Sequence, residues 1–260
     1  DVKSGTLAVS NNNACGANML TLENGTFQAD GGPITIANPI QFFGNSTLAG
    51  IENLTFTGAG IIYGASRTVT VTNSAVTTFS GDISEGGAVG LGLIKAGSGL
   101  LVISGNNTYT GTTTINAGTL LVNNTTGTGT GTGNVSVNSA ATLGGTGTIS
   151  GSVSASNGSF VAPGNAAPGK LSSGPLALNA STTLTFELAT SASATDDEIA
   201  VTGNLTLDGT LNVADAGGYG VGTYTLLTYT GTLTNNGLSV GTMPAGFNGN
   251  IDTATLGQIK

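Results

Sequence analysis

Apolar and polar positions alternate in short pieces along the whole chain. Within residues 93–122, three apolar pieces at residues 100–103, 112–115 and 120–122 are separated by stretches rich in Gly, Asn, Ser and Thr. Each piece has the length of a β-strand and is too short for a helix. The same rhythm continues through the chain, so the pattern predicts an all-β protein.

Further strands are expected throughout the chain. The predicted ranges are 6–10, 54–57, 68–72, 182–188, 199–202, 205–207, 210–213 and 223–229. Residues 68–72 alternate cleanly, which indicates one buried face and one face in water. Residues 223–229 have the highest strand propensity of the chain. The core of the first stretch is expected to hold Phe27, Phe42, Phe43, Phe56 and Phe79.

Many short strands fit either an antiparallel β-sandwich or a β-solenoid of stacked coils. A solenoid predicts phrases of similar sequence, and residues 134–138, 141–145 and 147–151 are such phrases. The solenoid is therefore favoured, with the sandwich as the alternative. In a solenoid, the Asn, Thr and Ser residues at the turns are expected to stack into ladders along the axis.

The 260 residues are interpreted as a single elongated domain with three stretches, 1–92, 93–160 and 161–260. Only 7% of the residues are charged, so Thr, Ser, Asn and Gly must cover the surface. Residues 125–133 contain only Thr and Gly and are expected to form a loop that bulges from one face.

Charge and cysteine content exclude several classes of protein. The net charge is −8 and the five basic residues are scattered, which argues against nucleic acid as a partner. The sequence has no apolar run of about 18 residues, so no transmembrane helix is predicted. Cys15 is the only cysteine and cannot form an internal disulfide; it is interpreted as a small residue in a turn.

The search for chemistry predicts no catalytic residue, no cofactor and no metal site. The chain has no histidine, which removes the commonest general base and metal ligand. In the acidic run at 196–198, only Asp196 and Glu198 would share a face, and a strand entry is favoured over a calcium site. Asp82 and Glu85 are interpreted as flanking a turn. The tyrosines are expected in core or rim packing rather than on a sugar-binding face: Tyr63, Tyr109, Tyr219, Tyr224 and Tyr229.

Residues 104–120 read SGNNTYTGTTTINAGTL and closely resemble the passenger-associated transport repeat of autotransporters. Residues 162–171 and 197–211 are similar to phrases that follow this repeat in the family. The resemblance covers most of residues 93–230 and is loose before residue 93. It implies a right-handed parallel β-helix that is exported to the bacterial cell surface or the extracellular space.

The expected function is a non-enzymatic structural protein, a solenoid stalk or adhesin segment with an unidentified host or matrix ligand. The alternative is a carbohydrate-binding or polysaccharide-degrading β-helix. Val2, Leu7 and Val9 begin the chain in the middle of a phrase, and Leu256 and Ile259 end it in another. Self-association through these ends would form fibres, and excision from a longer passenger explains the same ends.

Overall fold

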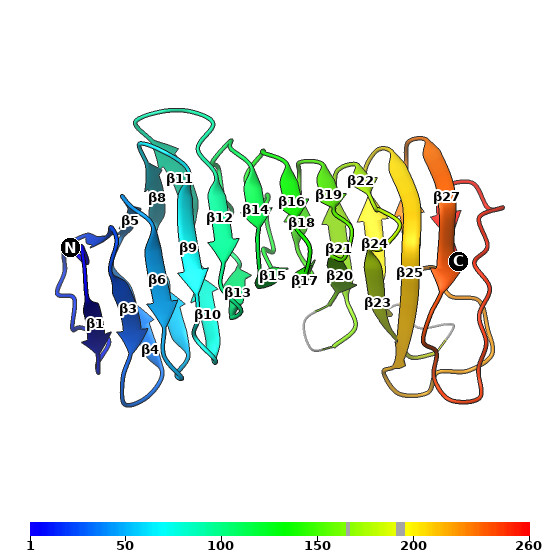
Figure 1. Ribbon diagram of the computed structural model, residues 1–260, viewed down its shortest axis with the longest axis horizontal. Coiled ribbons are helices and arrows are strands. Elements are labelled where there is room, and N and C mark those ends of the chain that lie inside the picture. Colours follow the sequence, from blue (N-terminus) through cyan, green and yellow to red (C-terminus); the bar gives the residue numbers. More distant parts are fainter. Residues whose placement is uncertain (165–166, 191–195) are drawn as a thin grey trace.

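The computed structural model describes residues 1–164, 167–190 and 196–260. In these ranges the chain forms strands and turns without a helix, and the strands stack into an elongated rod (Figure 1). The described strands pair in parallel along the rod, apart from β26 (Leu227–Tyr229) with β28 (Gln258–Ile259) at its C-terminal end. This arrangement confirms the predicted β-solenoid and excludes the antiparallel sandwich.

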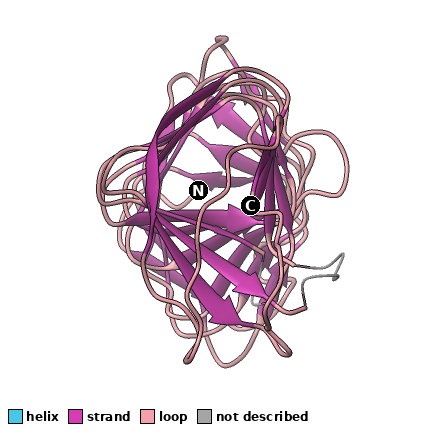
Figure 2. Cartoon of the chain, turned by 90° about the vertical axis from the view of Figure 1, so that its right-hand side faces the viewer, coloured by secondary structure: helices cyan, strands magenta, loops and turns pink. Residues whose placement is uncertain are grey.

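Each coil has three walls around a central core, seen end-on in Figure 2. The first wall contains β1 (Thr6–Val9), β3 (Thr26–Ala29), β6 (Ser46–Ala49), β9 (Arg67–Val71), β12 (Leu93–Ala96), β14 (Thr113–Ile115), β16 (Val135–Val137), β19 (Val153–Ala155), β22 (Leu176–Ala177) and the first halves of β25 (Leu205–Asp215) and β27 (Leu233–Val240). Successive strands of this wall belong to neighbouring coils.

The other two walls repeat the same plan. The second contains β4 (Ile34–Ile36), β7 (Leu54–Phe56), β10 (Val76–Phe79), β13 (Leu100–Ile103), β15 (Gly118–Val122), β17 (Ala141–Gly145), β20 (Phe160–Pro163), β23 (Thr183–Leu188) and the second halves of β25 and β27. The third contains β2 (Leu20–Leu22), β5 (Ile40–Phe42), β8 (Gly60–Tyr63), β11 (Ile83–Gly86), β18 (Thr148–Ile149), β21 (Lys170–Ser173), β24 (Glu198–Val201), β26 and β28.

Alternation along each strand builds the core. In β23, Leu184, Phe186 and Leu188 are buried, and the residues between them are half-buried. Neighbouring coils repeat this pattern in register, so inward side chains stack on inward side chains along the axis. Four of the five predicted core phenylalanines pack in contact, with ring centroids 5.2–5.7 Å apart in the pairs Phe27–Phe56, Phe56–Phe79 and Phe42–Phe79.

Phe43 is the exception, and its predicted place in the core is wrong. Its neighbour Phe42 points inward from the end of β5, so Phe43 points outward and is 42% exposed. Its ring stacks on that of Tyr63 in the next coil, with centroids 5.9 Å apart. The two rings form an aromatic pair on the outer face of the third wall.

Asparagine side chains connect consecutive coils, which confirms the expected ladders. Asn45 accepts a hydrogen bond from the backbone N–H of Thr68 at 2.9 Å, 23 residues further along the chain. The same contact occurs from Asn123 to Thr146 at 3.0 Å. One coil is therefore about as long as this separation, and a turn amide fixes the register between neighbours.

Residues 125–133 form no strand, as predicted, but they do not bulge from one face. Thr128, Gly129, Thr130 and Gly131 are buried. Their backbone continues the third wall between β11 and β18, because the N–H of Gly129 donates to the Thr148 carbonyl at 2.8 Å. The exposed residues of this segment are 125–127 before the buried part and Thr132 after it.

Two strand predictions differ from the structure. Residues 205–207 and 210–213 belong to one strand, β25, which turns the corner between two walls. In the stretch 223–229, only Leu227–Tyr229 is a strand. The preceding residues belong to the connection between β25 and β26, so tertiary context overrides their high local propensity.

The two ends of the rod differ. At the N-terminal end Leu7 is 40% exposed, whereas Val2 and Val9 are buried. At the other end Leu256 is 91% exposed, but Ile259 is fully buried and pairs with Leu227 in β26. The expectation that Ile259 lies free for self-association is therefore wrong, because the chain uses this residue in its own third wall.

Candidate functional site

The centre of the rod holds the phrase that carries the family resemblance. Tyr109 is fully buried at the corner before β14, and its hydroxyl lies 2.6 Å from the hydroxyl of Thr113. Burial raises the pKa of Tyr109, so the phenol stays neutral. This side chain fills the core where the third wall has no strand between β11 and β18 in the described structure.

Two asparagines of the same phrase bind the coils on either side. Asn107 accepts from the Ile83 N–H at 2.7 Å and donates to the Gly129 carbonyl. The backbone N–H of Asn106 donates to the Asp82 carboxylate at 2.7 Å. The consecutive asparagines therefore connect this coil to its neighbours.

Lys95 is a buried cation that no sequence motif singles out. It points inward from β12, with no exposed surface. Its ammonium donates to the carbonyls of Ala96, Gly97 and Ala117 at 2.7–3.0 Å. Burial lowers its pKa to about 8. The Lys95 ammonium therefore joins the turns of two neighbouring coils, and all of its hydrogen-bond partners are backbone carbonyls.

The acidic run at 196–198 leads into strand β24, as predicted. Asp197 is nevertheless fully buried, although acids at a strand entry usually avoid burial. Its carboxylate accepts from the Gly169 N–H at 2.7 Å and the Glu187 N–H at 2.6 Å. Burial raises its pKa to about 7, and the nearby Glu187 and Asp196 charges add to the effect.

Asp196 and Glu198, the two acids of this run that would share a face, have separate partners. Asp196 accepts from the Ala189 N–H at 2.7 Å. Glu198 pairs with Lys170 at 3.0 Å and accepts from the Thr228 hydroxyl at 2.9 Å. Across the three described ranges, no three carboxylate or thiol groups are grouped so that they could hold a metal ion.

Asp82 and Glu85 do not flank a turn, because strand β11 (Ile83–Gly86) occupies this segment. Glu85 accepts from the Leu91 N–H and the Thr110 hydroxyl, each at 2.7 Å. Both acids connect the backbone of this coil to its neighbours, as Asp82 does through Asn106. They are 3 residues apart in one strand segment and serve different partners.

The tyrosines mostly pack inward, as expected. Tyr109, Tyr224 and Tyr229 are buried, and Tyr219 is half-buried. Tyr63 is 39% exposed and lies beside Phe43. The core therefore takes most of the aromatic surface.

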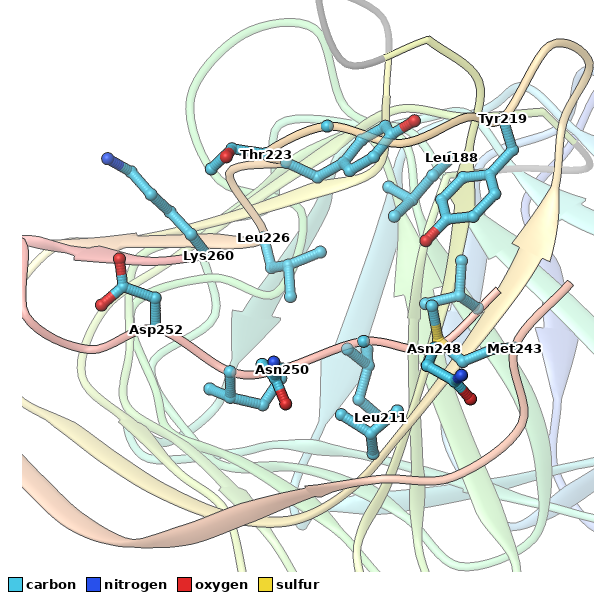
Figure 3. Close-up of a pocket in the computed structure, with 16 residues that line it drawn as sticks. Leu188, Leu211, Tyr219, Thr223, Leu226, Met243, Asn248, Asn250, Asp252 and Lys260 are labelled. Atoms are coloured by element: carbon cyan, nitrogen blue, oxygen red, sulfur yellow. The ribbon is translucent and has the colours of Figure 1, made fainter. Parts of the chain in front are cut away.

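A cavity lies at the C-terminal end of the rod (Figure 3). It has a volume of about 320 Å³ and lies between the last coils and the segment that crosses them after β27. No sequence pattern predicts this cavity, because its lining comes from residues between 188 and 260 that only the fold brings together.

No helix in the described part of the chain has the length and apolar character needed to cross a membrane.

Comparison with known proteins agrees with the repeat in the structure. Residues 93–122 match the family model described as the passenger-associated-transport-repeat. A curated relative, the "Adhesin BmaC autotransporter" of Brucella suis biovar 1 (strain 1330), is 47% identical over 106 residues. The match covers 38% of this chain and 3% of that protein, so the chain spans a small part of its relative. The family resemblance seen in the sequence is confirmed.

Proposed function

We propose that this chain, which carries an autotransporter passenger repeat at residues 93–122, is a rigid extracellular segment of a bacterial surface adhesin. The observation that supports this most directly is the continuity of the repeat with the rod. Strand β12 pairs with β9 before it and β14 after it, and β15 pairs with β13 and β17. A rod bonded in this way along its length suits a stalk that holds adhesive surface away from the cell.

The chemistry of the chain fits export and folding outside the cell. Each coil contacts mainly its neighbours, so folding can spread from coil to coil without long-range assembly. The fold uses no disulfide, since Cys15 is the only cysteine. The relative that it resembles is an adhesin by name, and this supports the same class of function here.

The proposed role is non-enzymatic. The buried polar groups Lys95, Asn107 and Asp197 make their hydrogen bonds with backbone atoms. Glycosidase chemistry instead needs two carboxyl groups facing each other across a substrate. Release of reducing ends from a panel of neutral and acidic polysaccharides by the pure chain would contradict this part of the proposal.

The proposed role does not require fibre assembly. The pairing of β28 with β26 uses Ile259 within the chain, while β1 offers a strand with an exposed Leu7 at the other end. Electron microscopy at low and high protein concentration should show separate short rods. Long uniform fibres at high concentration would show that self-association is part of the function.

Surface display tests the adhesive role. The chain is fused to the outer-membrane anchor of an unrelated protein and displayed on a non-adherent bacterium, with protease removal confirming its exposure. We expect several-fold more bacteria on epithelial monolayers than with an unrelated β-solenoid of similar length. Equal adherence of the two displayed rods would contradict an adhesive role.

A further inference from the structure

The cavity at the C-terminal end combines an apolar floor with a polar rim. The floor is formed by Leu188, Leu211, Val213 and Leu226, which are the inward residues of the last coils. Figure 3 shows Leu188, Leu211 and Leu226 among the side chains around the cavity. The volume of about 320 Å³ lies within the usual range for small-molecule pockets, roughly 300–1,000 Å³.

Unused hydrogen-bonding groups surround this floor. The rim includes Asn248, Asn250, Asp252 and Lys260, and Figure 3 shows the hydroxyl of Tyr219 pointing into the space. The side chains of Asn248 and Asn250 and the Tyr219 hydroxyl make no hydrogen bond to another described residue. Asp252 accepts one bond, from the Ala254 N–H at 2.8 Å, which leaves further acceptor positions.

The aromatic side of the rim is held in place. The ring of Tyr219 stacks on Tyr224 with centroids 5.1 Å apart and meets Phe247 edge-on at 4.9 Å. The Tyr224 hydroxyl donates to the Gly220 carbonyl at 2.9 Å. The Tyr219 hydroxyl is therefore presented to the cavity by a packed cluster and not by a lone side chain.

We propose that this cavity binds one neutral sugar residue of a glycan. Amides and a carboxylate match hydroxyl groups, which both donate and accept hydrogen bonds. The apolar floor matches the C–H face of a pyranose ring, and the exposed amides can exchange water for the hydroxyl groups of a sugar. The lining carries one acid and one base, Asp252 and Lys260, so it has no net charge that would select a charged sugar. This assignment rests on the proposed adhesive function and names a ligand class for it.

Titration of the ¹⁵N-labelled chain with the methyl glycosides of glucose, galactose, mannose and N-acetylglucosamine tests the site. With at least one of them, we expect saturable shifts of the Asn248 and Asn250 side-chain amide signals, with a Kd of order 1 mM, which corresponds to about −4 kcal/mol. Asn250→Ala and Tyr219→Phe should each weaken binding about tenfold, since each removes a hydrogen bond to the ligand. Asn236→Ala is the matched control, because Asn236 is exposed on β27 outside the cavity.

The absence of saturable shifts with all four glycosides would overturn the proposal, as would equal binding by Asn250→Ala and Asn236→Ala. If the displayed chain promotes adherence but the pure chain binds no sugar, the site is refuted and the adhesive function stands. If the chain binds a sugar but does not promote adherence, the adhesive function is refuted and the site stands. Glycans released from a mammalian glycoprotein and a bacterial O-antigen polysaccharide are then compared, because both can supply the same neutral sugar.

Discussion

The side-chain oxygen of Asn107 accepts a hydrogen bond at 2.7 Å from the backbone N–H of Ile83, one coil earlier. The amide nitrogen of the same side chain donates to the Gly129 carbonyl, one coil later. A single buried amide therefore joins three successive coils. This amide lies where the third wall lacks strands between β11 and β18 in the described structure. Side-chain hydrogen bonds therefore replace part of the backbone hydrogen bonding that paired strands would supply there.

Asn107→Ala should lower the free energy of unfolding by about 2–4 kcal/mol, because it leaves a buried N–H and a buried carbonyl without a partner. Urea denaturation followed by circular dichroism measures the change. Asn138→Ala is the matched control, since Asn138 bonds to Asn116 on the surface at 2.7 Å. We expect it to cost less than about 1 kcal/mol. Equal losses in the two variants would show that the connection through Asn107 is not a special source of stability.

The buried hydroxyl pair of Tyr109 and Thr113 gives a second test. Tyr109→Phe leaves the Thr113 hydroxyl unpaired in the core and should cost about 1–2 kcal/mol. Adding Thr113→Val removes the remaining polar atom. The double variant is therefore expected to be more stable than the sum of the two single changes predicts, as a thermodynamic cycle measures. Additive losses would mean that the two hydroxyls do not interact in solution.

The sequence carried enough information for the solenoid because the strands are short and the phrases recur at coil length. The expected asparagine ladders follow from the same periodicity, as Asn45 and Asn123 show. The burial of residues 128–131 was not predictable in this way. Thr and Gly carry no apolar signal, and these residues are buried because other coils cover them.

Gly131 tests the revised place of this segment. Its φ is +63°, a conformation that favours glycine, and an added Cβ would collide with the Tyr109 carbonyl oxygen. Gly131→Ala is therefore expected to destabilise the chain by more than about 2 kcal/mol. Thr126→Ala, on the exposed residues just before, should stay within about 0.5 kcal/mol of the parent. A tolerated Gly131→Ala would support the bulging loop that the sequence suggested.

The buried charges and the cavity were beyond sequence reasoning for one physical reason. Lys95 lies between apolar neighbours in a strand and Asp197 lies in an acidic run, and neither context shows that the charge is buried. Their burial depends on which carbonyls and N–H groups the neighbouring coils bring to them. The floor of the cavity likewise consists of core leucines and valines, whose exposure to a cavity depends on how the last coil is covered.

The buried Lys95 should make the free energy of unfolding rise with pH. Its pKa is about 8 in the folded chain because of burial, whereas an unfolded lysine has a pKa of about 10.4. Between these values the unfolded state binds more protons, so the free energy of unfolding should increase as the pH rises. Lys95→Met should remove this increment, and Lys3→Met, an exposed change, should keep it. Identical pH slopes in the two variants would contradict a buried titrating amine.

The buried Asp197 should give the opposite pH dependence of the free energy of unfolding, in a lower pH range than Lys95. Burial raises its pKa to about 7 in the folded chain, compared with about 3.9 when unfolded. The folded state therefore holds a proton that the unfolded state has released, and stability should fall as the pH rises from about 4 to 7. Asp197→Asn should flatten this fall in thermal unfolding at pH 4.5 and pH 8, while Asp30→Asn, an exposed change, should leave it in place. A variant whose pH profile runs parallel to that of the parent would show that Asp197 is ionised without cost in the folded chain.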